Sequence, residues 1–92
     1  MTKQILINVI VKEEDKGYSV ICPELNVASQ GETFEEGISN IKEAVELYIE
    51  SAEQLGIFDE VLEQLGISKE DFGKGRIIPR LVTANVPIEI AV

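Results

Sequence analysis

Hydrophobic and polar residues alternate at the beginning of the chain, over residues 4–12. A period of two is typical of a β-strand with one apolar face. Turn-forming residues at 13–17 separate this segment from a second apolar run at 18–22, which predicts a β-hairpin. Pro23 ends the second strand because proline cannot donate to a β-ladder. Residues 27–30 then predict a short third strand that completes a meander.

The pattern changes to a period of three and four after Gly31, which predicts a long helix over residues 33–55. Thr33 is the expected N-cap, with Glu36 as its capping-box partner. Gly56 is the expected helix stop. The apolar stripe of this helix consists of Phe34, Ile38, Ile41, Val45, Tyr48, Ala52 and Leu55.

A shorter helix is predicted over residues 58–65, ended by Gly66. We expect residues 57–80 to form a helical and loop insertion, in which Ser68 and Asp71 could cap one more turn. Residues 85–92 alternate again and predict a last strand, which Pro87 places at a sheet edge.

These elements predict an α+β fold in the order β-β-β-α-(α)-β. A right-handed crossover would return the last strand beside the first and parallel to it. We therefore expect a four-stranded, mostly antiparallel sheet in the order 3-2-1-4, with the long helix packed on one face. The other face would carry Leu6, Ile10 and Ile21. It would need cover from residues 57–80, from a partner or from a second copy of the chain, and we expect a homodimer.

The chain has 92 residues, which is enough for one domain, and we expect residues 1–92 to form it. No apolar run approaches the length of a membrane span, so we expect a cytoplasmic protein that does not contact the membrane. The single Cys22 and the lack of histidine exclude zinc sites and histidine-based catalysis. We expect no cofactor.

The formal net charge is −9, from 17 acidic and 8 basic residues. Such a charge repels a phosphate backbone, so direct binding of nucleic acid is not expected. It either aids solubility or attracts a basic partner. The basic cluster of Lys74, Arg76 and Arg80 is too small to reverse this expectation; it could neutralise nearby acids or make an intersubunit contact.

Several segments together resemble the HicB antitoxin family. The resemblance covers roughly residues 5–50 and 86–91. The segments that carry it are 15–25 (DKGYSVICPEL), 29–36 (SQGETFEE), 40–44 (NIKEA) and 46–50 (ELYIE).

The resemblance implies a partial ribonuclease H-like fold and a non-enzymatic protein that binds another protein. Family members typically dock on a small basic HicA-type toxin, a ribonuclease that acts on messenger RNA, and mask its active site. Many members also carry a C-terminal DNA-binding module. We expect no such module after the last strand of this chain.

Candidate partner-binding residues lie in three parts of the chain. They are Asp15, Tyr18, Cys22, Pro23, Glu24, Leu25, Glu43, Glu46 and Glu50. Asp15 and Tyr18 lie at the hairpin, where turn chemistry is the alternative explanation. Residues 22–25 form a loop that could instead simply end a strand around a buried thiol. The glutamates of the helix form an acidic strip that either binds a basic toxin or is a solvated helix face.

Two alternatives to the antitoxin role remain. The first is a HicB-like domain without a toxin that binds some other protein. The second is a metal-dependent nuclease, which a ribonuclease H-like fold brings to mind. Its chemistry needs several carboxylates converging on two metal ions. The first strand offers none at its centre, so we expect no catalytic residues and no metal site.

Overall fold

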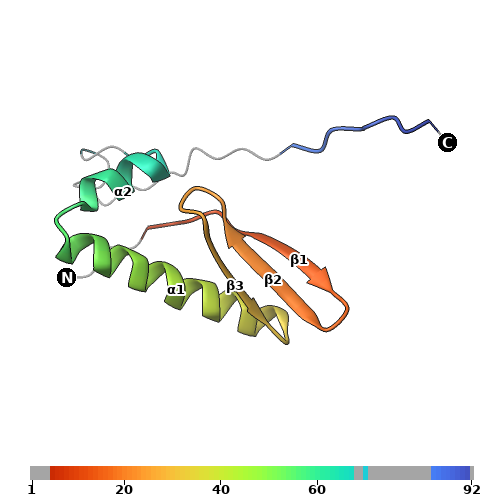
Figure 1. The fold of residues 1–92 in the computed structure, drawn as a ribbon, viewed down its shortest axis with the longest axis horizontal. Coiled ribbons are helices and arrows are strands. Elements are labelled where there is room, and N and C mark those ends of the chain that lie inside the picture. Colours follow the sequence, from red (N-terminus) through yellow and green to blue (C-terminus); the bar gives the residue numbers. More distant parts are fainter. Residues whose placement is uncertain (1–4, 68–69, 71–83, 92) are drawn as a thin grey trace.

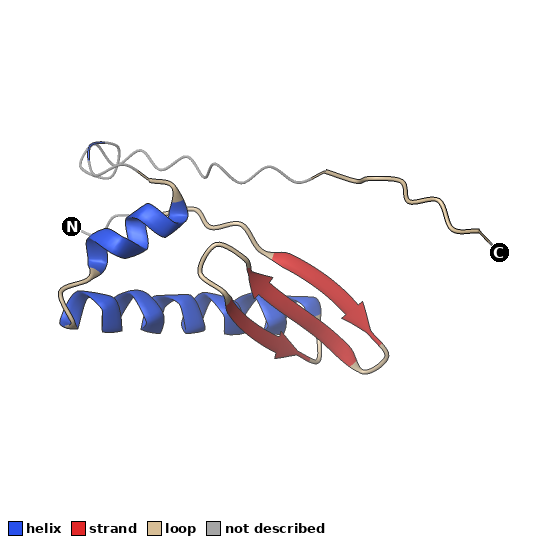
Figure 2. Cartoon of the chain, turned by 45° about the horizontal axis from the view of Figure 1, so that its top comes forward, coloured by secondary structure: helices blue, strands red, loops and turns tan. Residues whose placement is uncertain are grey.

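Within the residues that the structure describes, the protein forms a three-stranded sheet, one long helix and one short helix (Figure 1). We analysed a computed structural model that describes residues 5–67, Glu70 and residues 84–91. Its elements are β1 (Ile10–Glu14), β2 (Gly17–Cys22), β3 (Val27–Gly31), α1 (Phe34–Gln54) and α2 (Phe58–Leu65). The sheet is an antiparallel meander in the order β1-β2-β3. Figure 2 shows α1 running along the sheet and α2 folded back over one end of α1.

The β1–β2 hairpin has a two-residue loop, Asp15 and Lys16, closed by Glu14 opposite Gly17. Gly17 has φ +144°, and a Cβ there would lie 2.5 Å from the carbonyl oxygen of Gly31 on β3. The turn between β2 and β3 uses Asn26 at φ 55°, a left-handed conformation that asparagine tolerates well. These two turns fix the register of the meander.

The N-terminus of α1 is held by side-chain hydrogen bonds. The Thr33 Oγ1 accepts from the backbone N–H of Glu36 at 3.1 Å. The Glu36 Oε1 accepts in turn from the backbone N–H of Glu32 at 3.4 Å, one residue before the N-cap. Glu35 and Glu36 lie in the first turn, where the positive end of the helix dipole stabilises carboxylates.

Both helices end in the same way, because the string Glu-Gln-Leu-Gly-Ile occurs at 53–57 and at 63–67. Gly56 and Gly66 adopt left-handed conformations, at φ 74° and φ 71°. The following isoleucine N–H then bonds five residues back, from Ile57 to Ala52 and from Ile67 to Leu62, each at 2.9 Å. This is the Schellman arrangement, and it satisfies the last carbonyls of each helix. The two glycine stops predicted from the sequence are confirmed.

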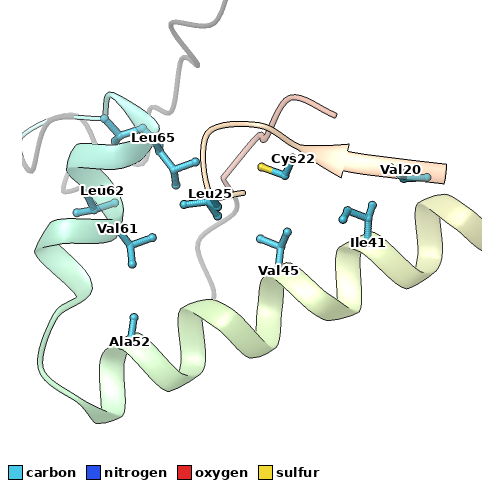
Figure 3. Close-up of a cluster of buried hydrophobic side chains, with 10 residues drawn as sticks. Val20, Cys22, Leu25, Ile41, Val45, Ala52, Val61, Leu62 and Leu65 are labelled. Atoms are coloured by element: carbon cyan, nitrogen blue, oxygen red, sulfur yellow. The ribbon is translucent and has the colours of Figure 1, made fainter. Parts of the chain in front are cut away.

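The core lies between the sheet, α1 and α2 (Figure 3). Ile41 and Val45 of α1 face Val20 and Cys22 of β2, while the far end of α1 packs on α2. The buried hydrophobic residues are Val20, Cys22, Leu25, Ile41, Val45, Ala52, Val61, Leu62, Leu65 and Ile67. The predicted apolar stripe of α1 is thus buried only along its middle; Phe34 and Leu55 at its ends are exposed.

The predicted four-stranded sheet is wrong. Residues 84–91 form no strand, and their apolar side chains are 72–77% exposed at Val86, Ile88 and Ile90. This segment runs clear of the sheet (Figure 1). An alternating pattern shows that a segment tolerates an extended backbone, but a strand exists only where its N–H and C=O groups find a neighbouring strand. The order 3-2-1-4 therefore reduces to β1-β2-β3, and the second helix is an established part of the fold.

The other boundaries differ by a few residues at most, except at the first strand. β1 begins at Ile10, where the alternation predicts a strand from residue 4. Residues 5–9 have no ladder partner, although Ile5, Ile7 and Val9 pack against the core. The predicted cap at Ser68 and Asp71 and the basic cluster at 74–80 lie outside the described residues.

The sheet face opposite α1 is only partly covered. Leu6 and Ile10 are 66% and 49% exposed, and Ile21 is half-buried. Within residues 5–67, the second helix packs mainly on α1. Part of the predicted apolar surface is therefore open in the single chain.

Candidate functional site

The hairpin end of the sheet forms an open groove with the start of α1. We call it the hairpin groove, and its lining consists of residues 12–19, residues 29–32, Glu36 and Asn40. The meander explains how these segments meet. The β1–β2 loop and the end of β3 lie at the same end of an antiparallel sheet, and α1 begins three residues after β3.

The groove carries more negative than positive charge. Its carboxylates are Glu13, Glu14, Asp15, Glu32 and Glu36, against the two lysines Lys12 and Lys16. All seven side chains are exposed. A concentration of exposed carboxylates gives a negative potential that attracts cationic side chains of a partner.

Polar contacts hold the walls of the groove in place. The Ser19 Oγ donates to the Glu14 carboxylate across the hairpin. The Asn40 Nδ2 donates to the Gln30 carbonyl at 2.8 Å and so ties α1 to the outer edge of β3. Tyr18 meets Phe34 edge-to-face, with ring centroids 6.3 Å apart, which ties the hairpin to the first turn of α1.

The nine partner-binding residues predicted from the sequence do not form one surface. Asp15 and Tyr18 line the hairpin groove. Residues 22–25 lie at the opposite end of β2, in the turn to β3. Glu43, Glu46 and Glu50 lie on the exposed side of α1. The nine residues therefore lie at three separate places on the molecule.

The turn at residues 22–25 is mostly part of the core. Cys22 is fully buried and Leu25 is 5% exposed. Burial raises the pKa of the Cys22 thiol, an effect that the nearby Glu24 carboxylate increases and backbone hydrogen bonds from Leu25 and Glu24 oppose. Pro23 is exposed, and Glu24 is half-buried with its Oε1 accepting from the Asn8 amide at 3.5 Å. Only these two residues of the turn present a side chain to the surface.

The acidic strip of α1 is fully solvated. Glu43, Glu46 and Glu50 are exposed, and Glu46 pairs with Lys42 at 3.2 Å. Both partners of that pair are more than 60% exposed, so it contributes little to stability. The strip is a flat helix surface with one of its charges already paired.

Sequence reasoning missed most of the groove. It singled out Asp15 but gave no binding role to Glu13, Glu14 or Glu32. The signal was present, because three consecutive acids precede the hairpin glycine and Glu32 directly follows the third strand. A meander brings those two places together.

The described residues show neither a metal-binding cluster nor a membrane span. No three cysteine or acidic side chains among them are placed to hold a metal ion. None of the helices seen in residues 5–67 is long and apolar enough to cross a membrane.

Comparison with known proteins decides the family. Residues 6–78 match the family model of the HicB-like antitoxins of bacterial toxin–antitoxin systems. The chain belongs to the HicB-like antitoxin family. The resemblance found in the sequence is thereby confirmed. Membership supports an antitoxin role, with a toxin as partner and without catalysis, in the general terms that apply to the family.

Two bacterial relatives agree with this family. A UPF0150 protein of Synechocystis is 49% identical over 61 residues, which cover 65% of this chain and 67% of the relative. A UPF0150 protein of Helicobacter pylori strain J99 is 44% identical over 46 residues, which cover 49% of this chain and 64% of the relative. The matches thus span about two thirds of each relative. No solved structure matches the HicB-like chain significantly.

Proposed function

We propose that this HicB-like chain is an antitoxin that binds a small basic ribonuclease of the HicA type and masks its active site. Family membership supports an antitoxin role, and the acidic hairpin groove supports a basic partner. A ribonuclease that binds RNA carries cationic side chains for the phosphates. The same side chains can pair with the groove carboxylates, so the antitoxin would compete directly with RNA.

The hairpin groove is the docking surface we favour over the α1 strip. It is concave, and its five carboxylates outnumber its two lysines. The α1 strip is a helix face on which Lys42 already neutralises Glu46. Complementary charge raises the association rate most where the field is focused in a cleft.

The experiment compares two sets of charge-neutralising variants against a HicA-type toxin with an inactivated active site. The groove set is Glu13→Gln, Asp15→Asn and Glu32→Gln. The matched strip set is Glu43→Gln, Glu50→Gln and Glu53→Gln. Each set removes three negative charges from exposed side chains. Stopped-flow association at several salt concentrations gives the rate constant and its salt dependence.

We expect the groove set to slow association about tenfold or more and to flatten its salt dependence. The strip set is expected to leave the rate within about twofold. The opposite ranking would move the docking surface to α1. In a second assay, the wild-type chain should inhibit RNA cleavage by the active toxin at equimolar concentration. Failure to bind any HicA-type toxin would favour the alternative of a HicB-like domain that binds another protein.

We also propose that the antitoxin is a homodimer. The support is the apolar surface left open in the single chain, at Ile10 on the sheet, at Leu6 in the segment before β1 and along residues 84–91. Contiguous exposed apolar surface is typical of interaction sites.

A further inference from the structure

The two edges of the sheet differ in their free hydrogen-bonding groups. A two-residue loop can be closed only by a pair that exchanges both backbone hydrogen bonds, so Glu14 and Gly17 form such a pair. Successive residues of a strand point their N–H and C=O groups to alternate sides. The groups of Lys12 therefore point toward β2, and those of Val11 and Glu13 point away from it. Within the described residues, nothing hydrogen-bonds the outward groups of Val11 and Glu13. We call this side of β1 the free edge.

The edge at β3 is partly occupied. The Asn40 side chain donates to the outward carbonyl of Gln30 at 2.8 Å. The helix that supplies Asn40 also makes more contact with β3 than with any other strand. An added strand would have to displace this hydrogen bond at β3, whereas no such bond is found at β1 among the described residues.

Residues 84–91, which we call the arm, have the properties of a strand without a partner. Val86, Ile88 and Ile90 alternate with polar or small residues and are 72–77% exposed. Figures 1 and 2 both show the arm running clear of its own sheet. An extended segment with unpaired backbone groups and three exposed branched side chains can pair with the sheet edge of another chain.

Proline fixes which side of the arm can pair. Side chains and backbone hydrogen-bonding groups both alternate with a period of two along a strand. Val86, Ile88 and Ile90 therefore share one hydrogen-bonding side, and Pro87, which has no N–H, belongs to the other. The arm can form backbone hydrogen bonds through its three apolar residues. The backbone nitrogen of Pro87 then lies on the unpaired side, which is where edge strands carry proline.

We propose that the arm of one copy adds as an edge strand to the free edge of β1 in a second copy, and that reciprocal exchange of two arms forms the homodimer. The exchange removes two exposed features at once, the unpaired edge of β1 and the apolar arm. This inference rests on the proposed homodimer and is independent of toxin binding. An arm that paired with its own sheet would cover the same groups without a second copy, and the experiment separates the two cases.

The first measurement is the mass of residues 1–92 by light scattering after size exclusion. We expect twice the 10.2 kDa of one chain at high micromolar concentration. Ile88→Asp places a charge on the apolar side of the arm and should weaken the dimer about 100-fold or more. Glu89→Lys, on the other side, is the matched control and should remain dimeric. Masses measured over a series of chain concentrations give the dissociation constant of each dimer. A monomeric wild type, or an Ile88→Asp dimer as tight as the wild type, would overturn the proposal.

Amide hydrogen exchange by NMR then locates the arm. The Val11 and Glu13 amides point outward, so we expect them to be protected in the wild-type dimer and to exchange rapidly in Ile88→Asp. The Lys12 amide points toward β2 and should be protected in both. Rapid exchange at Val11 and Glu13 in a wild-type dimer would place the interface elsewhere and refute the pairing. Because none of these substitutions lies in the hairpin groove, the toxin-binding assay separates failure of this inference from failure of the antitoxin proposal.

Discussion

Gly31 lies where β3 gives way to α1, and we predict that alanine there strongly destabilises the fold. A Cβ at Gly31 would lie 2.4 Å from the Gly37 backbone nitrogen, 2.8 Å from the Glu36 carbonyl carbon and 2.9 Å from the Gly37 Cα. All three are backbone atoms of α1, so no side chain can rotate away. The helix start would have to move by about 1 Å from the sheet, and overpacking of this kind costs about 3 kcal/mol.

The unfolded state offsets a small part of this cost. Alanine has less backbone entropy to lose than glycine, which contributes about 0.5 kcal/mol in the other direction. The net loss of about 2.5 kcal/mol corresponds to a fall in Tm of about 10–20 °C for a domain of this size. Circular dichroism melts measure it directly.

Gly37 provides the control, because it is the α1 residue that Gly31 of β3 approaches. A Cβ there would meet one side-chain methyl, Val20 Cγ2, at 3.0 Å. Alanine in a helix also gains about 1 kcal/mol over glycine. Gly37→Ala should therefore melt within about 5 °C of the wild type. If Gly31→Ala melts as high as Gly37→Ala, the close approach of β3 and α1 does not exist as described.

Two further predictions concern the N-cap and the buried thiol. Thr33→Ala removes the oxygen that accepts from Glu36 and should cost about 1 kcal/mol in the free energy of unfolding, measured by urea titration, while Thr33→Ser should retain most of it. An equal loss in both variants would mean that the hydroxyl hydrogen bond is not the cause. Because burial raises the pKa of the Cys22 thiol, the unfolded chain releases this proton at a lower pH than the folded chain. Cys22 therefore makes stability fall as pH rises above the ordinary thiol value of 9.0 and has no such effect well below it. The measurement is the difference in unfolding free energy between the wild type and Cys22→Ala as a function of pH, and a difference that grows in favour of the wild type above this value would contradict the burial.

Local patterns in the sequence predicted the local elements well. The Thr33 cap geometry, the two glycine stops and the meander all follow from interactions between residues close in the chain. The prediction of a last strand failed because strand formation depends on a neighbour that is distant in sequence. An alternating pattern carries no information on which sheet edge a segment will pair with. The predicted start of the first strand at residue 4 was wrong for the same reason. Ile5 and Ile7 pack against the core, but they have no ladder partner.

The candidate site was harder to predict than the fold. The acids at residues 13–15 and Glu32 are far apart in a linear reading, and only the return of β3 to the hairpin end brings them into one groove. For the turn at residues 22–25, the sequence left two interpretations open, a contact loop or the end of a strand around a buried thiol. The structure buries Cys22 and Leu25 in the core, while the binding role predicted for this turn stays a prediction.

The core and the hairpin groove share no side chain among the described residues. The buried hydrophobic residues begin at Val20 and extend toward α2, whereas the groove lies at the other end of the sheet. Replacing a groove carboxylate changes surface charge without opening a cavity or uncovering apolar surface. Mutations at Glu13, Asp15 and Glu32, whose side chains have no hydrogen bond or ion pair among the described residues, are thus nearly neutral for folding and can accumulate in a population. With the proposed docking at the groove, the contact surface of the antitoxin can change along with its toxin while the core of the fold stays intact.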